Sequence, residues 1–407
     1  AQALRNSATL LFIQGEFAST GVALRKISHL YKDADSLEAA IQIAEALGDD
    51  SSRVSFWQEY KRDFSKAGSF SKLELAFAKF QEKKSNDPDA TQAYKECSSA
   101  SQGDIQVECE YRLGLLYARL GIQTDAIASL KKAASSKVQG VGAFYVGAAR
   151  WELAQIAERE LSVQASQEAQ LTAENLAKVL PRRLQSFELL QRAMNPVLEL
   201  GGPYSLPASL RLGSAAIALA NEIKAVAPND KTVGQAAKAL KVKAAQIFRQ
   251  QLSLAQSNEW LSPDWVLLAA ELSGLDGTPR AQGPKPTLAW MAAGSKDGVR
   301  ESVKIEQVRE SLSVNARDAQ AWAMYGRWLA KENSSLALIA LERAQALEPK
   351  NTAIKNNKAI VRASLNDVET AWGAFVLNGE LREASSTDPQ ALRPKSNRAQ
   401  LLNYFGI

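Results

Sequence analysis

The chain has 407 residues, of which 46% are hydrophobic and 23% are charged, the proportions of an ordinary folded protein. No apolar run approaches the roughly 20 residues that a membrane-spanning helix needs, so we predict no transmembrane segment, although association with a membrane complex stays open. The net charge of +5, from 49 basic and 44 acidic residues, is a small excess and argues against nucleic acid as the partner.

The residues that most enzyme sites need are scarce. The chain has one histidine, His29, and two cysteines, and His29 has no cysteine or second histidine at metal-ligand spacing. Neither a phosphate-binding loop nor a dinucleotide fingerprint is present. We therefore predict no metal, no cofactor and no catalytic residue, and a structural or exposed role for His29.

The first hundred residues read as helical hairpins. Leu4, Ala8 and Leu11 precede a turn at Gly15, and Leu24 continues the pattern on a second helix. Four further helices are expected at residues 35–47, 51–64, 71–81 and 90–97. The aromatic side chains of the helix at 51–64 are expected to fill the core rather than to form a ligand platform. They are Phe56, Trp57, Tyr60 and Phe64.

Residues 107–140 carry the clearest pattern in the chain. Gly114 and Ala126 are small where two helices must approach closely, and Tyr117 and Leu130 are large enough to fill the space between the helices. Gly121 stands where the first helix has to end. The spacing predicts a helix, a tight turn and a second helix, a unit that buries its apolar face only when neighbouring units stack on it.

The pattern weakens between residues 141 and 275. We expect a helix at 141–163, an interruption at Pro181, and two long helices at 207–226 and 231–256. Lys231, Lys238 and Lys241 fall on one face of the last helix, which is typical of a solvated surface.

A boundary follows at Gly274 to Gly298, where Gly and Pro are too frequent for a helix. We interpret this stretch as a connecting loop whose Trp290 fills a gap between helices, or alternatively as a loop that gates a binding site. Repeats return beyond it, with Trp322 and Gly326 on a first helix and Leu341 on a second. The terminal residues 401–405 are expected to cap the array or to extend from it.

These motifs resemble those of the tetratricopeptide repeat (TPR) superfamily, whose period is about 34 residues. The resemblance is good at 107–140 and 319–385, partial at 1–34 and 71–104, and poor from 160 to 275. It implies an all-α fold, a right-handed solenoid of antiparallel helix pairs. It also implies a concave groove, lined by the first helix of each repeat, that holds a partner peptide or helix. Carried onto this chain, the groove positions are Tyr111, Arg112, Arg119, Arg327, Lys331, Asn356 and Asn357.

The two cysteines flank a turn near residue 103. Cys97 ends one helix and Cys109 begins the next, so that their side chains are placed symmetrically about the turn. Either a disulfide bridge or two small buried thiols fits this placement. A bridge would indicate an oxidising compartment, and the first residues, Ala1-Gln2-Ala3 without Met, resemble a mature exported protein.

The sequence thus predicts a non-catalytic scaffold that binds a protein or peptide partner, within a bacterial envelope assembly in the periplasm. The alternatives are a cytoplasmic regulator that binds a peptide signal or nucleic acid and, less favoured, a cell-wall enzyme with a helical superstructure. Five segments are expected: N-terminal repeats at 1–140, divergent helical repeats at 141–275, a linker at 276–298, C-terminal repeats at 299–387 and a tail at 388–407. The oligomeric state is left open.

Overall fold

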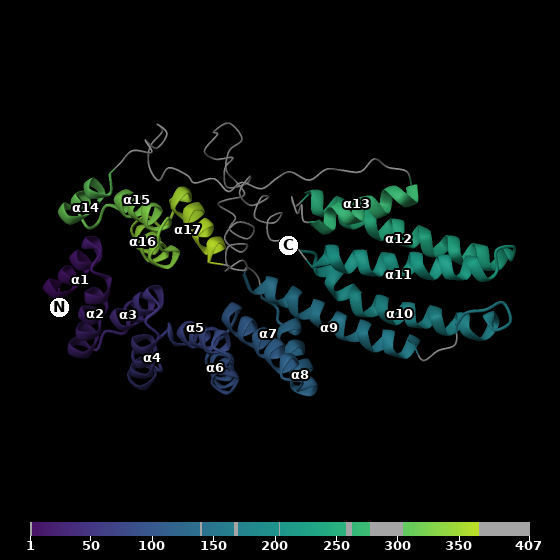
Figure 1. The fold of residues 1–407 in the computed structure, drawn as a ribbon, viewed down its shortest axis with the longest axis horizontal. Coiled ribbons are helices and arrows are strands. Elements are labelled where there is room, and N and C mark those ends of the chain that lie inside the picture. Colours follow the sequence, from purple (N-terminus) through teal and green to yellow (C-terminus); the bar gives the residue numbers. More distant parts are fainter. Residues whose placement is uncertain are drawn as a thin grey trace. The chain divides into compact units, whose positions relative to one another are not determined.

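The computed structural model describes residues 2–138, 141–166, 170–202, 204–257, 263–276 and 304–365. Throughout these ranges the secondary structure is helical, with no strand. Successive helices pack as antiparallel pairs, so the all-α class and the helix-pair organisation predicted from the TPR resemblance are confirmed (Figure 1). Among the described helices, none is both long and apolar enough to cross a membrane.

The described helices fall into two compact units. Unit 1 combines the two ends of the described chain. Its first part contains α1 (Gln2–Gln14), α2 (Phe17–Tyr31), α3 (Ala34–Leu47), α4 (Asp50–Phe64), α5 (Phe70–Lys83) and α6 (Asp87–Ala100). Its second part contains α14 (Ile305–Val314), α15 (Ala319–Leu329), α16 (Ser334–Leu347) and α17 (Thr352–Ser364).

Unit 2 contains the middle of the chain, and its four central helices, α9 to α12, are the longest, with 22 to 27 residues each. The helices of unit 2 are α7 (Asp104–Arg119), whose first turn holds the division between the units, α8 (Gln123–Ser135), α9 (Val141–Ser166), α10 (Leu176–Leu200), α11 (Ser205–Val226), α12 (Lys231–Ser257) and α13 (Pro263–Asp276). The five segment boundaries expected from the sequence stay predictions. The loop expected from Gly274 begins later, because Gly274 lies in the last turn of α13. The rest of the expected linker, residues 277–298 with Trp290, and the tail at 388–407 lie outside the described residues.

Close helix approach explains the small residues of the repeats. A Cβ atom built on Gly114 of α7 would lie 2.7 Å from Cγ of Leu130 on α8, and one built on Gly326 of α15 would lie 2.7 Å from Cγ of Leu341 on α16. Gly121 has φ = +77°, the left-handed conformation that the predicted turn needs. The two clearest repeats therefore fold by the same contact at equivalent positions.

The expected interruption at Pro181 is wrong. Pro181 and Pro196 both lie inside α10. A proline removes one helical hydrogen bond, but α10 buries an apolar face that includes Phe187, Met194 and Val197. Packing of that face outweighs the local loss, as tertiary context often outweighs propensity.

Candidate functional site

The first helices of the chain share one hydrophobic core with the helices at residues 305–364. Phe12 and Ile13 of α1 and Ile43 of α3 belong to the same cluster as Trp322 and Tyr325 of α15. The aromatic rings pack directly: the Phe12 centroid lies 6.0 Å from that of Trp322 and 6.2 Å from that of Tyr325. Helices that are about 300 residues apart in sequence therefore share one buried surface.

Hydrogen bonds fix the register of this contact. The buried hydroxyl of Tyr325 donates to the carbonyl oxygens of Phe12 at 3.2 Å and Ile13 at 3.4 Å, which lie in the last turn of α1. Asn333 donates from Nδ2 to the carbonyl oxygen of Ala46 at 2.8 Å, while its Oδ1 accepts from the backbone N–H of Leu336. One asparagine thus caps the start of α16 and also satisfies a carbonyl group near the end of α3.

Beside this contact lies an open groove of about 690 Å³, which we call the terminal groove. Its walls come from α1, α2 and α3 on one side and from α14, α15, α16 and the α14–α15 turn on the other. Exposed aliphatic side chains stand on both walls, since Leu10 is 41% exposed and Val314 is 86% exposed. The other apolar side chains that line it include Phe12, Leu24, Ile43, Leu312, Trp322 and Ile339.

The charged side chains of the terminal groove are of two kinds. Arg5 and Asp33 form an ion pair at 2.8 Å, and Asp33 also accepts from Ser36 at 2.6 Å. Burial alone would raise the pKa of Asp33, but the hydrogen bonds from Ser36 and Arg5 outweigh it and the pKa is lowered. Arg317 and Arg343 are exposed, and their guanidinium groups have no acceptor among the described residues. Asp35, which is also exposed, adds one carboxylate to the lining. The groove therefore offers an apolar floor with two cations and one carboxylate available to a partner.

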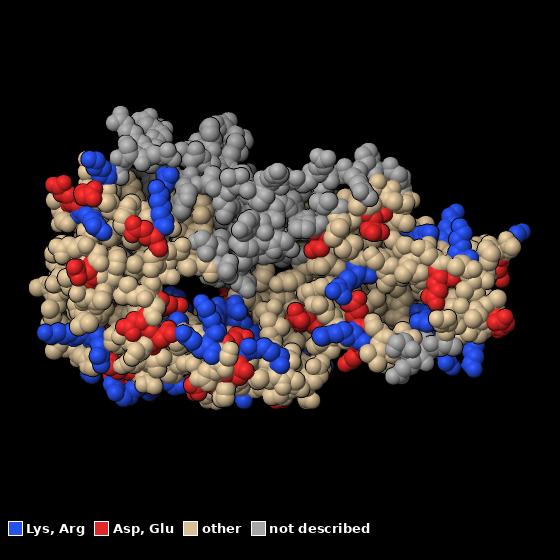
Figure 2. Space-filling model, viewed as in Figure 1, with Lys and Arg blue, Asp and Glu red and all other residues tan. Residues whose placement is uncertain are grey.

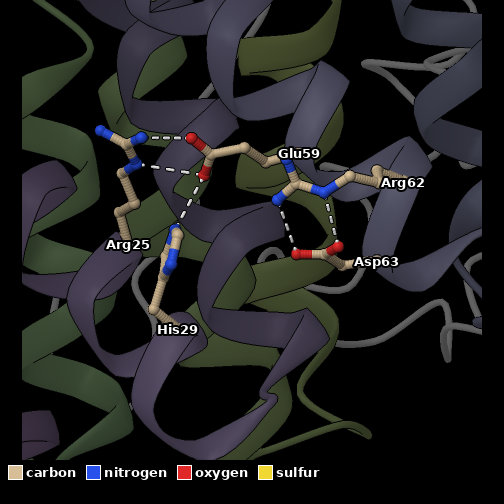
Figure 3. Close-up of polar contacts among 5 residues, drawn as sticks. All are labelled: Arg25, His29, Glu59, Arg62 and Asp63. Atoms are coloured by element: carbon tan, nitrogen blue, oxygen red, sulfur yellow. Dashed lines mark hydrogen bonds and ion pairs between the residues drawn. The ribbon is translucent and has the colours of Figure 1, made fainter.

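Ion pairs at the repeat period connect the second helices of unit 1. Arg25 of α2 donates to Glu59 of α4 from Nε at 3.1 Å, and the partners are 34 residues apart (Figure 3). Lys61 of α4 pairs in the same way with Glu96 of α6, 35 residues along the chain. The spacing shows that α2, α4 and α6 are equivalent helices of successive repeats with a period near 34 residues.

His29 takes part in this network rather than in any catalytic arrangement of the described residues. Its Nε2 lies 3.0 Å from Oε2 of Glu59, and its side chain is 49% exposed (Figure 3). Burial would raise the pKa of Glu59, but Arg25 and His29 lower it overall. This is the structural and exposed position that the sequence predicts for His29.

The predicted groove residues of unit 2 lie on α7. Arg112 donates from Nε to Glu108 at 2.7 Å and lies 5.9 Å from the ring centroid of Tyr145. Tyr111 packs against the same Tyr145 ring, with the centroids 5.8 Å apart. Both side chains are partly buried in these contacts, whereas Arg119, in the last turn of α7, is exposed. A role in partner binding stays a prediction for all three.

The predicted groove residues of unit 1 divide by exposure. Arg327 is partly buried in the last turn of α15, and Lys331 is exposed just beyond it. Asn356 and Asn357 of α17 are 0% and 2% exposed, and Nδ2 of Asn356 lies 3.3 Å from Oδ1 of Asn357. A partner would reach these two amides only if the residues that cover them moved, so their binding role stays a prediction.

None of the seven predicted partner-binding residues lines the terminal groove. Sequence reasoning missed this groove because its two walls come from opposite ends of the chain. The one usable signal was the junction Ser311 to Trp322, where Leu312, Val314 and Trp322 all prove to line one wall. Nothing in the sequence around α1 indicated what would face that junction.

Both cysteines are completely buried. Cys97 lies in α6 and Cys109 in α7, each with 0% exposure, and neither is a free thiol. Because the two residues belong to different units, the bridge between them stays a prediction. Within the described residues, no group of three or more His, Cys, Asp and Glu side chains is placed to hold a metal ion.

No protein-family model and no curated protein matches the chain. Its structure is similar to the crystal structure of the P58(IPK) TPR domain, with 11% identity and a TM-score of 0.24 over 98% of this chain and 97% of that one. It is also similar to yeast Tom70, with 10% identity and a TM-score of 0.25 over 98% and 95%, and to Naa15/Naa10 bound to HypK, with 13% identity and 0.27 over 95% and 70%. TM-scores this low support no argument from these structures. The helix pairs follow from the contacts within this chain.

Proposed function

We propose that the protein is a non-catalytic scaffold that binds a peptide or a short helix of a partner protein in the terminal groove. The observation that carries the proposal is the exposure of Leu10 and Val314 on opposite walls of a groove of about 690 Å³. A groove with an apolar floor and a few polar groups at its rim is the usual form of a peptide-binding surface. Arg317 and Arg343 would then pair with acidic groups of the peptide.

The sharpest test changes one exposed side chain of the groove. Val314→Gln should weaken partner binding by about tenfold, the loss that accompanies removal of one well-placed apolar contact. Val22→Gln on α2 is the matched control, because Val22 is also exposed, at 66%, and does not line the groove. Both variants should keep the melting temperature of the parent protein.

The partner is obtained by photo-cross-linking from position 314 in native lysate, with position 22 as the control. A protein captured at 314 alone, whose purified form binds the parent chain and binds Val314→Gln more weakly, supports the proposal. Equal binding of that protein to both variants contradicts it.

We further propose that the protein works in an oxidising compartment, as part of a bacterial envelope assembly. The absence of a free thiol at Cys97 and Cys109 supports the oxidising compartment. Mobility of reduced and non-reduced alkylated samples tests it. Two thiols that titrate in denaturant, in protein prepared from its native source, would contradict it.

A further inference from the structure

Helix α9 lies between α8 and α10 and packs against both (Figure 1). Each of the three helices contributes one alanine to the place where they meet: Ala134 from α8, Ala154 from α9 and Ala193 from α10. Packed helix axes are about 8–10 Å apart, and side chains as small as alanine do not fill the space between them. The result is an open hollow of about 430 Å³, which we call the α9 hollow.

Arg150 of α9 fixes the frame of the α9 hollow, which it also lines. Its Nε donates to the carbonyl oxygen of Ala134 at 3.1 Å, and its Nη1 donates to that of Pro196 at 3.0 Å. Ala134 lies in the last turn of α8, where carbonyl groups lack a helical donor, and Pro196 lies four residues before the end of α10. One guanidinium group thus joins the ends of two helices to the helix between them.

The α9 hollow has an excess of positive charge. Lys131 of α8 and Arg192 of α10 line it, and both are exposed and form no hydrogen bond or ion pair with a described residue. Glu199 adds one exposed carboxylate to the lining. The C-terminal ends of α8 and α10 together carry about one negative charge, which Arg150 offsets. Lys131 and Arg192 therefore leave an excess of about one positive charge over Glu199.

Cations in unit 1 are used differently. Arg25 and Lys61 pair there with carboxylates of the neighbouring repeat. Figure 2 shows acidic side chains beside basic ones over α1 to α6. Those ion pairs connect one repeat to the next, whereas Lys131 and Arg192 pair with no carboxylate of the described chain. The two cations of the α9 hollow are therefore available to a partner.

Apolar surface adjoins these charges. Leu153 of α9 is partly buried and Pro196 of α10 is exposed, and both line the α9 hollow. Leu189 and Leu200 of α10 are 42% and 39% exposed. Because successive helical residues turn by about 100°, Leu189, Pro196 and Leu200 fall within about 40° of one line along α10. The apolar surface of the hollow thus continues along the outside of this helix.

We infer that the α9 hollow is a second docking site, which takes a partner-protein segment that has one large apolar side chain between acidic residues. The apolar side chain lies over the three alanines, against Leu153 and Pro196, and the carboxylates pair with Lys131 and Arg192. Exposed ion pairs contribute little affinity by themselves, so the apolar contact provides binding and the charges select an acidic partner. This site lies within unit 2, whereas the terminal groove lies within unit 1.

The lining of the α9 hollow favours a protein segment over a nucleic acid. Proteins hold single strands by stacking the bases on aromatic side chains, and the described lining contains none. Binding through phosphates alone requires many cations along the strand, and only Lys131 and Arg192 are available among the described lining residues. An acidic peptide with one large apolar side chain uses both the charges and the apolar floor.

The test is photo-cross-linking of a defined peptide to the full chain. The probe carries a benzophenone side chain as its large apolar group, with glutamates on either side, and mass spectrometry locates the cross-links. We expect them at residues 131–135, 150–154 and 192–199, with a yield that falls as salt is raised. The same peptide with lysines in place of the glutamates is the first control. A single-stranded oligonucleotide and the peptide without benzophenone are compared as competitors.

Filling the hollow tests the apolar contact without a change of charge. Ala193→Met should lower the cross-linking yield at these residues by about tenfold, because the longer side chain occupies the space that the probe needs. Ala239→Met is the matched control, since Ala239 is exposed on α12 and does not line the hollow. Methionine is a good helix former, so both variants should keep the melting temperature of the parent protein.

Charge variants test the selection of an acidic partner in both directions. Lys131→Glu combined with Arg192→Glu should lower the yield by about tenfold, because two attractions become repulsions. Glu199→Gln should raise it by about twofold, because one repulsion is removed. An increase in yield cannot come from loss of folding, so this variant keeps the test decisive if the double variant is unstable.

Two lysines of α12 provide the control for net charge. Lys231 and Lys238 are exposed and have no described partner, as the sequence predicts for a solvated surface, whereas Lys241 is partly buried. Lys231→Glu combined with Lys238→Glu changes the net charge by the same amount within unit 2. It should lower the yield by less than about twofold.

Each other result overturns the inference. It fails if the peptide does not cross-link at the α9 hollow, if the lysine peptide cross-links there as well, or if the oligonucleotide competes more strongly than the peptide without benzophenone. It also fails if the hollow variants have no larger effect than their controls. Cross-links at residues 2–43 and 312–343 would report the terminal groove instead, and Val314→Gln should leave those at the α9 hollow unchanged. The two proposals can therefore fail separately.

Discussion

Glu74 of α5 is a buried carboxylate without a hydrogen bond. It is 0% exposed, and neither of its oxygens has a hydrogen-bond partner. Nζ of Lys61 lies 3.6 Å from Oε1 of Glu74 but also donates to Glu96. Burial raises the pKa of Glu74 from 4.5 to about 7, the attraction of Lys61 opposes the rise, and the repulsion of Glu96 adds to it.

The raised pKa of Glu74 predicts how stability depends on pH. The folded state holds the proton of Glu74 more tightly than the unfolded chain does, so this group makes stability fall as pH rises from about 4.5 to 7. Glu74→Gln should therefore raise stability above about pH 7 by on the order of 2 kcal/mol and change it little near pH 5. Thermal melts at both pH values check this, with Glu310→Gln, at an exposed position, as the control. An equal effect of Glu74→Gln at both pH values would be evidence against the assignment.

Tyr325 tests the contact between the ends of the chain. Tyr325→Phe removes the donor to Phe12 and Ile13 and should lower the free energy of unfolding by about 1 kcal/mol. Hydrogen exchange of residues 2–14 should become faster, because the last turn of α1 loses its link to α15. Tyr60→Phe is the comparison, since the Tyr60 hydroxyl bonds to nearby Ser69 at 2.7 Å and to no other described residue, and its loss should leave α1 unchanged. Faster exchange of α1 in both variants, or in neither, would rule out a specific link.

At the scale of helices, a glycine at a helix–helix contact and a glycine on an open helix surface should respond in opposite ways to substitution by alanine. Gly114→Ala should destabilise the chain by about 1 to 3 kcal/mol, because the new methyl group would overlap Leu130. Gly234→Ala in α12 should instead stabilise it by up to about 1 kcal/mol, because nothing lies within 4 Å of a Cβ atom there and alanine favours helix. Thermal melting of the two variants gives the comparison. Shifts of the same sign would show that the helix pair does not pack as described.

The hairpins were predictable from sequence wherever contacts are local. Gly114, Gly121 and Leu130 indicated one helix pair, and the helices predicted at 207–226 and 231–256 are observed at Ser205–Val226 and Lys231–Ser257. The prediction from Pro181 was wrong because tertiary packing, rather than local helix propensity, determines where α10 begins and ends. Single-sequence periodicity also indicates the buried side of a helix but not which distant helix covers it. The pairing of Phe12 with Tyr325, and with it the terminal groove, therefore required the structure.

On the scale of the whole molecule, the predicted bridge between Cys97 and Cys109 closes a short loop around the division between the units. If it forms, the Cys97→Ser, Cys109→Ser variant should lose about 3 kcal/mol, the value expected for a loop of this length in the chain-entropy account. The same loss should follow when the parent protein is reduced, and the variant should not respond to reductant. A parent protein that melts at one temperature with or without reductant would exclude a stabilising bridge.

The central claim is that α1 to α6 and α14 to α17 form one unit whose groove binds a partner protein. Hydrogen exchange of the intact protein, with and without the partner captured from position 314, tests it most directly. The account predicts slower exchange on binding in both walls together, at residues 2–14 and at residues 304–317. Slower exchange in one wall alone, or in neither, would contradict it.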